Sequence, residues 1–166
     1  MTKESISQNE LLKLFEVKDG VLYWKVNKPY SRYKAGDIAG RKVKDGYMQV
    51  CVNRIRILNH QVVFKMFYGY IPKTIDHIDG NVSNNRIENL RPATLSQNQY
   101  NSKTSTRNKS GVKGVHWNVS RKKWHVQLSV NGKQTTFGLY NDLELASLVA
   151  QEARDKYHGV FANHGS

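Results

Sequence analysis

A polar, basic segment in the middle of the sequence most constrains how this chain can fold. Residues 99–111 are rich in Asn, Ser, Thr and Lys and contain almost no apolar side chain. Such a composition is typical of a linker and not of a hydrophobic core. We therefore expect two small α+β domains, over residues 1–98 and 110–166, joined by a basic polar linker over residues 99–109.

Short helix and strand patterns alternate in the first part. Apolar positions at helical spacing predict helices over residues 11–15 and 59–68. Alternating apolar residues predict strands over residues 21–24 and 47–52, the latter with residues 55–58 as a hairpin partner. We expect these elements to form a β-rich N-terminal extension in front of the polar residues between Asp76 and Asn98.

The second part predicts a three-stranded antiparallel sheet packed on one helix. Strand patterns cover residues 114–117, 124–130 and 133–139, and the Asn-Gly pair at 131–132 is a strong hairpin signal between the last two. A helical apolar pattern follows, and Asn141 is expected to cap that helix.

The charge distribution points to a nucleic-acid partner. The formal net charge is +13, from 26 Lys and Arg against 13 Asp and Glu, and no acidic residue occurs between Asn89 and Asn141. Such a surplus favours a polyanion. An anionic membrane is the second choice, but the longest apolar-rich stretch, over residues 62–71, is interrupted by Lys65 and is too short to span a bilayer.

Cysteine content and the N-terminus indicate the compartment. Cys51 is the only cysteine, so an internal disulfide and a paired-cysteine zinc site are excluded. Residues 1–10 are polar and do not resemble a signal peptide. We expect a cytoplasmic protein, in the host cytoplasm if a phage encodes it.

Asp76, His77, Asn89 and Asn98 form the pattern that carries chemistry. Cutting a phosphodiester requires a base that activates water, a cation that stabilises the leaving oxygen, and a held phosphate. An imidazole titrates near neutral pH, so a histidine suits the base. Asp and Asn oxygens are hard ligands that suit Mg²⁺ or Mn²⁺. Because adjacent strand residues point to opposite faces, Asp76 and His77 need a bend, which Asp79-Gly80 can supply.

Two sequence runs around these residues resemble the HNH nucleases, specifically the homing endonucleases of phage introns and intergenic regions. The runs are Asp-His-Ile-Asp-Gly-Asn at residues 76–81 and Asn-Arg-Ile-Glu-Asn-Leu-Arg at 85–91, followed by Asn98. The resemblance implies a ββα-metal fold in which the first strand carries Asp76 and His77 and a helix carries Asn98. It implies that His77 is the general base, that Asn89 orders the site, and that Asp76 and Asn98 bind the metal.

The third motif position departs from many members of that family, which have histidine where this sequence has Asn98. Asparagine is found there in a phage subgroup that nicks one strand. The departure puts zinc or nickel in doubt and leaves Mg²⁺ or Mn²⁺ as the expected cofactor. The neighbouring Arg86 and Arg91 are candidate phosphate contacts, and ordinary surface charge is the alternative for both.

The second part resembles the DNA-binding domain of ethylene-response factors, the APETALA-two type, which also occurs in phage homing endonucleases. The matching runs are Ser-Gly-Val-Lys-Gly-Val at residues 110–115, Lys-Trp at 123–124 and Phe-Gly-Leu-Tyr at 137–140. The resemblance implies that the sheet enters the major groove of double-stranded DNA while the helix packs behind it. Strand alternation and charge then give the expected DNA-contacting residues: Lys113, His116, Asn118, Arg121, Lys123, Gln127, Ser129, Gln134 and Thr136.

The sequence as a whole predicts a metal-dependent DNA endonuclease of the homing type that nicks DNA and acts as a monomer. A regulator that only binds DNA is the main alternative, although it would not need the complete set of Asp76, His77, Asn89 and Asn98. An RNA-binding protein ranks third, because the aromatic residues do not follow an RNA-recognition pattern.

Overall fold

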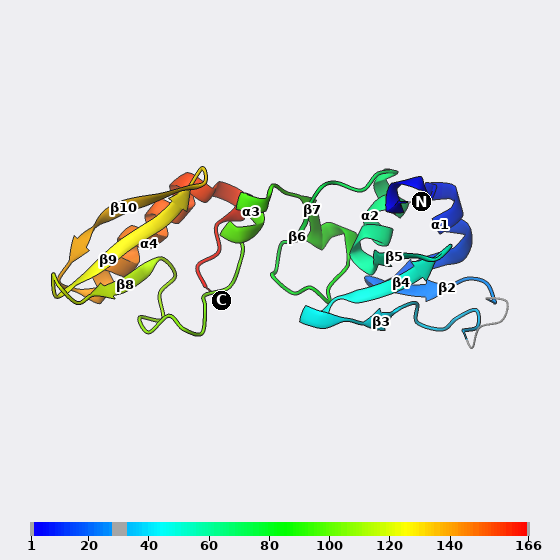
Figure 1. Ribbon diagram of the computed structural model, residues 1–166, viewed down its shortest axis with the longest axis horizontal. Coiled ribbons are helices and arrows are strands. Elements are labelled where there is room, and N and C mark those ends of the chain that lie inside the picture. The colour runs from blue at the N-terminus through cyan, green and yellow to red at the C-terminus, as the bar shows by residue number, and fades with distance from the viewer. Residues whose placement is uncertain (1, 28–32, 166) are drawn as a thin grey trace. The chain divides into compact units, whose positions relative to one another are not determined.

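The computed structural model describes residues 2–27 and 33–165, and the chain divides into two compact units, residues 1–93 and 94–166 (Figure 1). Both units combine helices with small antiparallel sheets. The predicted α+β class is therefore confirmed. Among the described residues, no helix is both long enough and apolar enough to cross a membrane.

The first unit contains three small sheets and two α-helices. Strands β1 and β2 form a hairpin, β3, β4 and β5 form a three-stranded sheet in that order, and β6 pairs with β7. The elements are η1 (Lys3–Ser5), α1 (Gln8–Leu14), β1 (Phe15–Lys18), β2 (Val21–Trp24), β3 (Arg41–Lys42), η2 (Lys44–Gly46), β4 (Met48–Val52), β5 (Ile55–Leu58), α2 (Asn59–Tyr68), β6 (Ile75–His77), η3 (Ile87–Asn89) and β7 (Leu90–Pro92).

Helix α2 lies at the centre of the first unit's core. Its Val62, Val63 and Phe64 are almost fully buried and belong to one apolar cluster that also includes Leu11 of α1 and Leu22 of β2. The helix ends at Gly69, whose left-handed backbone (φ 81°) places its N–H 2.9 Å from the Lys65 carbonyl. This core supports the β6–β7 hairpin, since Ile75 and Leu90 belong to the same cluster.

The second unit is built on a three-stranded antiparallel sheet with the strand order β10-β9-β8. Val115 and Val126 form a buried cluster with Ala146 and Ala150 of α4, so the longest helix packs on one face of this sheet. The small alanines allow close approach of the helix. The elements are α3 (Leu95–Tyr100), β8 (Val115–Asn118), β9 (Lys123–Val130), β10 (Lys133–Tyr140), α4 (Leu143–His158) and η4 (Gly159–Phe161).

Helix α4 begins one residue later than expected. Asp142, and not Asn141, is the N-cap, and its carboxylate accepts the Leu145 N–H at 2.8 Å. Both side chains can cap a helix, but the carboxylate also interacts favourably with the positive end of the helix dipole.

The segment that was expected to be a linker is anchored in the second unit. The Tyr100 ring stacks on His158 with centroids 3.7 Å apart, and its hydroxyl accepts the Asn131 N–H at 3.0 Å. The Asn163 side chain donates to the Asn101 carbonyl at 3.0 Å. This polar segment is therefore packed despite its low apolar content, through one aromatic ring and through hydrogen bonds between side chains and backbone groups.

Candidate active site

The β6–β7 hairpin presents the two residues with which the nuclease motif begins. Asp76 pairs with Arg91 and His77 with Leu90 across the strands, and Asp76 and His77 are both buried. A turn follows immediately, in which the Gly80 N–H donates to the His77 carbonyl at 2.8 Å and the Ile78 N–H to the Asn89 carbonyl at 2.9 Å. A turn is present at Asp79-Gly80, but it follows β6, in which Asp76 and His77 both keep the regular strand register.

The His77 ring is oriented by Asn85. Its Nε2 lies 3.0 Å from the Asn85 Oδ1, and both side chains are buried. An amide oxygen only accepts hydrogen bonds, so in the neutral ring the proton lies on Nε2 and Nδ1 is the basic nitrogen. The contact between Asn85 and His77 was not anticipated from the sequence. The position of Asn85 eight residues after His77, on the returning arm of the loop, was the available signal.

Asn89 fastens the loop that follows His77. Its Oδ1 accepts the Asp79 N–H at 3.0 Å, while its Nδ2 donates to the Asp79 Oδ1 at 2.9 Å and to the Asn84 carbonyl at 2.8 Å. These hydrogen bonds connect the two arms of the loop at their base. Because Asn85 follows Asn84 directly, the same bonds restrict the position of the amide that contacts His77.

Asp79 is held in its ionised form by this network. Burial alone would raise its pKa, but the hydrogen bonds from the Asn84 side chain, the Asn81 backbone and the Asn89 side chain outweigh burial and lower the pKa. The Asn84 amide donates to Asp79 Oδ2 at 2.7 Å. The turn therefore carries a fixed negative charge near the start of the loop.

Two further rings surround His77. The His60 ring of α2 meets it edge to face with centroids 5.2 Å apart, and the Tyr47 ring lies 5.3 Å from His60 and 6.1 Å from His77. Burial, together with the proximity of His77, lowers the pKa of His60 to about 3. His60 therefore stays neutral at physiological pH and shields one side of His77 without adding charge.

Asp76 on β6 forms an ion pair with Arg91 on β7. The Arg91 Nε lies 2.7 Å from Asp76 Oδ2, and the pair is largely shielded from solvent. Arg91, which was expected as a phosphate contact, thus also neutralises Asp76. Among residues 2–27 and 33–165, no three His, Cys, Asp or Glu side chains gather as metal ligands would.

The donor chemistry of Asp76 fits a hard cation. A carboxylate oxygen is a ligand that Mg²⁺ and Mn²⁺ prefer, and Mg²⁺ needs only one or two carboxylates because it retains waters and binds substrate phosphate oxygens. A zinc site would require three or four N, S or O ligands from the protein. The available residues therefore fit the expected Mg²⁺ or Mn²⁺ better than zinc.

Asn98, the expected second metal ligand, lies on α3 in the second unit, whereas Asp76 and His77 belong to the first. Thr94 is the N-cap of this short helix: its hydroxyl accepts the Gln97 N–H at 3.1 Å, and the Gln97 side chain accepts the Thr94 N–H at 2.8 Å. The cluster described above therefore consists of first-unit residues alone.

The second unit places most of the expected DNA-contacting residues on one face of its sheet. The cross-strand pairs are His116–His125, Gln127–Thr136 and Ser129–Gln134, and partners in such pairs share a face. A hydrogen-bonded chain runs across all three strands, from His116 Nε2 to His125 Nδ1 at 3.0 Å and from His125 Nε2 to Thr136 Oγ1 at 3.1 Å. Burial and the neighbouring His116 lower the pKa of His125.

Several of the other expected contacts have partners within the protein. The Lys113 ammonium donates to the carbonyls of Tyr100 and Ser102, and burial beside Arg154 lowers its pKa to about 8. Lys113 therefore supports its own unit instead of pointing outward. The Asn118 side chain accepts the Arg121 N–H at 3.0 Å and so closes the β8–β9 turn. In the first unit, Arg86 forms an exposed ion pair with Asp19 at 3.2 Å.

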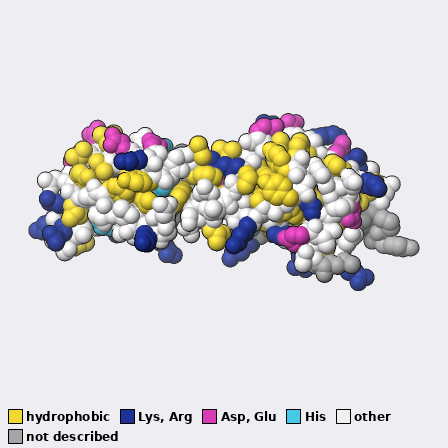
Figure 2. Space-filling view, turned by 90° about the horizontal axis from the view of Figure 1, so that it is seen from above, with side chains coloured by type: hydrophobic (Ala, Val, Ile, Leu, Met, Phe, Trp, Pro, Cys, Tyr) yellow, Lys and Arg dark blue, Asp and Glu magenta, His cyan; other side chains and the backbone are white. Residues whose placement is uncertain are grey.

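Other basic side chains of the expected DNA-contacting set lie at or beside the β8–β9 turn. Arg121 is exposed and Lys123 is half-buried. Figure 2 shows Lys and Arg side chains over both units on the face that it presents, with hydrophobic side chains between them.

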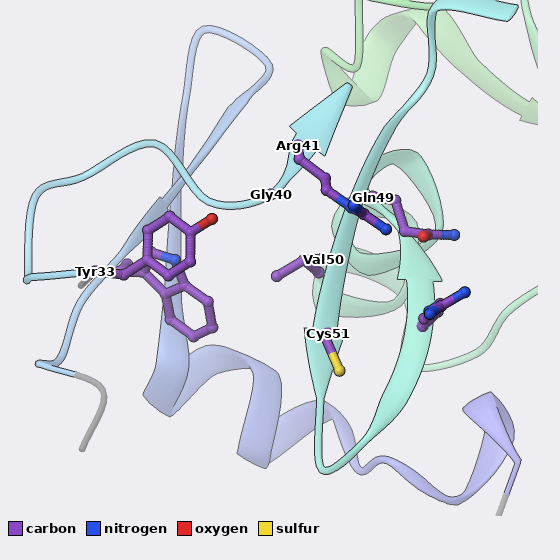
Figure 3. Close-up of a pocket in the computed structure, with 8 residues that line it drawn as sticks. Tyr33, Gly40, Arg41, Gln49, Val50 and Cys51 are labelled. Carbon is purple, nitrogen blue, oxygen red and sulfur yellow. The ribbon is translucent and has the colours of Figure 1, made fainter. Parts of the chain in front are cut away.

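A basic pocket of about 310 Å³ on the β3–β4–β5 sheet was not anticipated from the sequence. Arg41 pairs with Gln49 and Arg56 with Cys51 across the strands, so these side chains share one face. Figure 3 shows Tyr33 at one side of this pocket and Arg41, Gln49 and Cys51 at the other. The available signal was the alternation of these polar residues with buried Val50 and Val52.

Comparisons with known proteins give a family match that includes this hairpin. The HNH endonuclease family matches residues 58–100, which include α2, the β6–β7 hairpin and α3. Protein 3.8 of Escherichia phage T7 is 39% identical over 105 residues, which make up 62% of this chain and 86% of the phage protein. No solved structure matches the chain.

Proposed function

Because the chain belongs to the family of phage T7 protein 3.8 and contains an HNH endonuclease domain over residues 58–100, we propose that it is a metal-dependent endonuclease that nicks DNA. The observation that carries this proposal is the buried Asp76–His77 pair on a hairpin whose loop is fastened by Asn89. A homing function, acting as a monomer on a specific site of double-stranded DNA, is the finer form of the proposal.

His77 acts as the general base. The Asn85 amide oxygen holds the Nε2 proton, so Nδ1 takes the proton from the attacking water. His60 and Tyr47 limit the movement of the ring from the other side. Asn89 acts indirectly, because it holds the loop that presents Asn85, so it is a positioning residue in this scheme.

In this proposal Asp76 would hold the divalent cation, and Asn98 stays the second ligand that the resemblance to HNH nucleases implies. When bound, Mg²⁺ or Mn²⁺ would stabilise the negative charge that develops on the departing 3′ oxygen. Before the substrate binds, the positive charge of Arg91 neutralises the Asp76 carboxylate. Once a phosphate is present, the guanidinium of Arg91 is suited to contact it, because arginine matches phosphate geometry.

Binding to DNA is assigned to both units. In the second unit, the face that carries His116, Gln127 and Thr136 has the hydrogen-bonding groups needed to read base edges. Arg121 and Lys123 lie at the end of that sheet and supply sequence-independent phosphate contacts. In the first unit, the pocket with Arg41 and Arg56 offers a second place for the phosphate backbone.

A supercoiled plasmid that carries a cognate site tests this function. The parent protein should convert it to open circles with Mg²⁺ or Mn²⁺ and not with EDTA, and DNA ligase should reseal the nick because hydrolysis at the 3′ oxygen leaves 3′-hydroxyl and 5′-phosphate ends. Asp76→Ala should bind the plasmid and not cut it. Binding without cutting by the parent, with both metals and with genomic targets included, would favour a DNA-binding regulator instead.

A further inference from the structure

A groove of about 620 Å³ runs along β8, the edge strand of the second unit's sheet. One wall consists of the loop over residues 105–110, and the other of Trp117, Val119 and Trp124. All of these residues belong to the second unit. Its lining also includes His116, which belongs to the sheet face that carries His125.

The loop wall is held in place by side-chain hydrogen bonds. The Asn108 amide donates to the Val112 carbonyl at 2.7 Å, and the Ser110 hydroxyl lies 2.7 Å from both the Asn108 Oδ1 and the Val115 carbonyl. These bonds fasten the loop to the start of β8. The groove is therefore a built feature of this unit, and its loop wall does not depend on apolar packing.

The opposite wall exposes a large apolar surface. Trp117 is 45% exposed and Val119 is 79% exposed, and the Trp117 and Trp124 rings meet edge to face with centroids 5.0 Å apart. Strand alternation places both indoles on the face of the sheet opposite His116 and His125. Exposed aromatic surface in a groove commonly marks a ligand site.

The charges around the groove identify the class of ligand. Arg107 and Lys109 line it and are both exposed, and none of the described residues that line it is acidic. The absence of Asp and Glu between Asn89 and Asn141 extends this positive character to the whole neighbouring sequence. A ligand that combines a flat aromatic ring with a negative charge would satisfy both walls, and a nucleotide has both.

The aromatic wall discriminates between paired and unpaired nucleotides. In a duplex, both faces of each base are covered by its neighbours, so a tryptophan can stack only on a base that is unpaired or extruded. We propose that this groove binds an unpaired segment of DNA, with a base stacked on Trp117 and the phosphates beside Arg107 and Lys109. The proposed nuclease function enters only in the choice of DNA over other polynucleotides.

Fluorescence anisotropy with the full chain and a labelled oligothymidine of about ten nucleotides tests this proposal. The parent should bind it, and Trp117→Ala should weaken binding by about tenfold or more, because stacking on an aromatic side chain contributes that much per base. Tyr157→Ala, which truncates an aromatic side chain of similar exposure on α4, should bind as the parent does. Arg107→Ala should weaken binding several-fold and reduce its salt dependence.

Failure of this proposal is distinguishable from failure of the nuclease assignment. Duplex binding and plasmid nicking by Trp117→Ala should remain within about twofold of the parent, and its thermal unfolding should be unchanged, since the side chain is nearly half exposed. If Trp117→Ala does unfold more readily, oligothymidine binding by Arg107→Ala, on the exposed loop, tests the proposal instead. Equal oligothymidine binding by parent and Trp117→Ala, no binding by the parent, or tighter binding of a matching RNA would each overturn the proposal.

Discussion

Replacing Asn85 with alanine isolates the contribution of the group that orients His77. The substitution removes the acceptor that lies 3.0 Å from the buried Nε2 of His77. Loss of one partner of a buried hydrogen bond costs about 1–3 kcal/mol. If that cost falls on the reactive orientation and tautomer of the ring, the rate of nicking should fall by about 5- to 150-fold.

Single-turnover nicking with saturating protein measures this effect, because it reports the chemical step and not product release. Asn84→Ala is the matched control: its side chain contacts Asp79 in the same loop and does not contact His77. The control should retain most of the parent's rate. A folded Asn85→Ala protein that nicks within about twofold of the parent would refute the role of Asn85 in orienting the base.

Three further substitutions test which interactions stabilise each of the two units. Asn89→Ala removes three side-chain hydrogen bonds at a partly solvated loop and should cost about 1–2 kcal/mol, lowering the Tm of the first unit by about 5–10 °C in calorimetry. Gly20→Ala should also lower this Tm and slow nicking. The φ of Gly20 is +78°, and an added Cβ would lie 2.5 Å from the backbone nitrogen of Arg86. In the second unit, burial lowers the pKa of His158, so the unfolded state takes up its proton first and stability should fall as the pH decreases below about 6.5. Thermal unfolding at several pH values should show this slope for the parent and a weaker slope for His158→Gln; equal slopes would contradict it.

Local patterns in the sequence were sufficient for most of the secondary structure. The hairpin signal at residues 131–132 and the alternation over residues 47–52 predicted strands that the structure contains. The Asp79-Gly80 turn and the order of Asp76, His77 and Asn89 were enough to indicate an HNH domain, and the match over residues 58–100 confirms this family.

Contacts between residues that are far apart in the sequence could not be predicted from these local patterns. His60 lies beside His77 only because α2 packs under the hairpin, and no spacing rule links the two positions. Asn85 resembles its neighbours Asn81 and Asn84, so its burial against His77 is a property of the folded loop alone. Tyr100 lies in a polar segment, and its stacking on His158 depends on where α4 ends.

The most direct test of the account is the ratio of nicking rates for the parent and His77→Ala on the same plasmid with Mg²⁺, under conditions in which both proteins bind all of the DNA. His164→Ala serves as the control histidine, since it lies near the C-terminus and pairs with Asp155. Loss of a general base should slow His77→Ala by about 10²- to 10⁴-fold while His164→Ala is unaffected. Equal rates for His77→Ala and the parent would contradict the assignment of His77 as the base and, with it, the proposed active site.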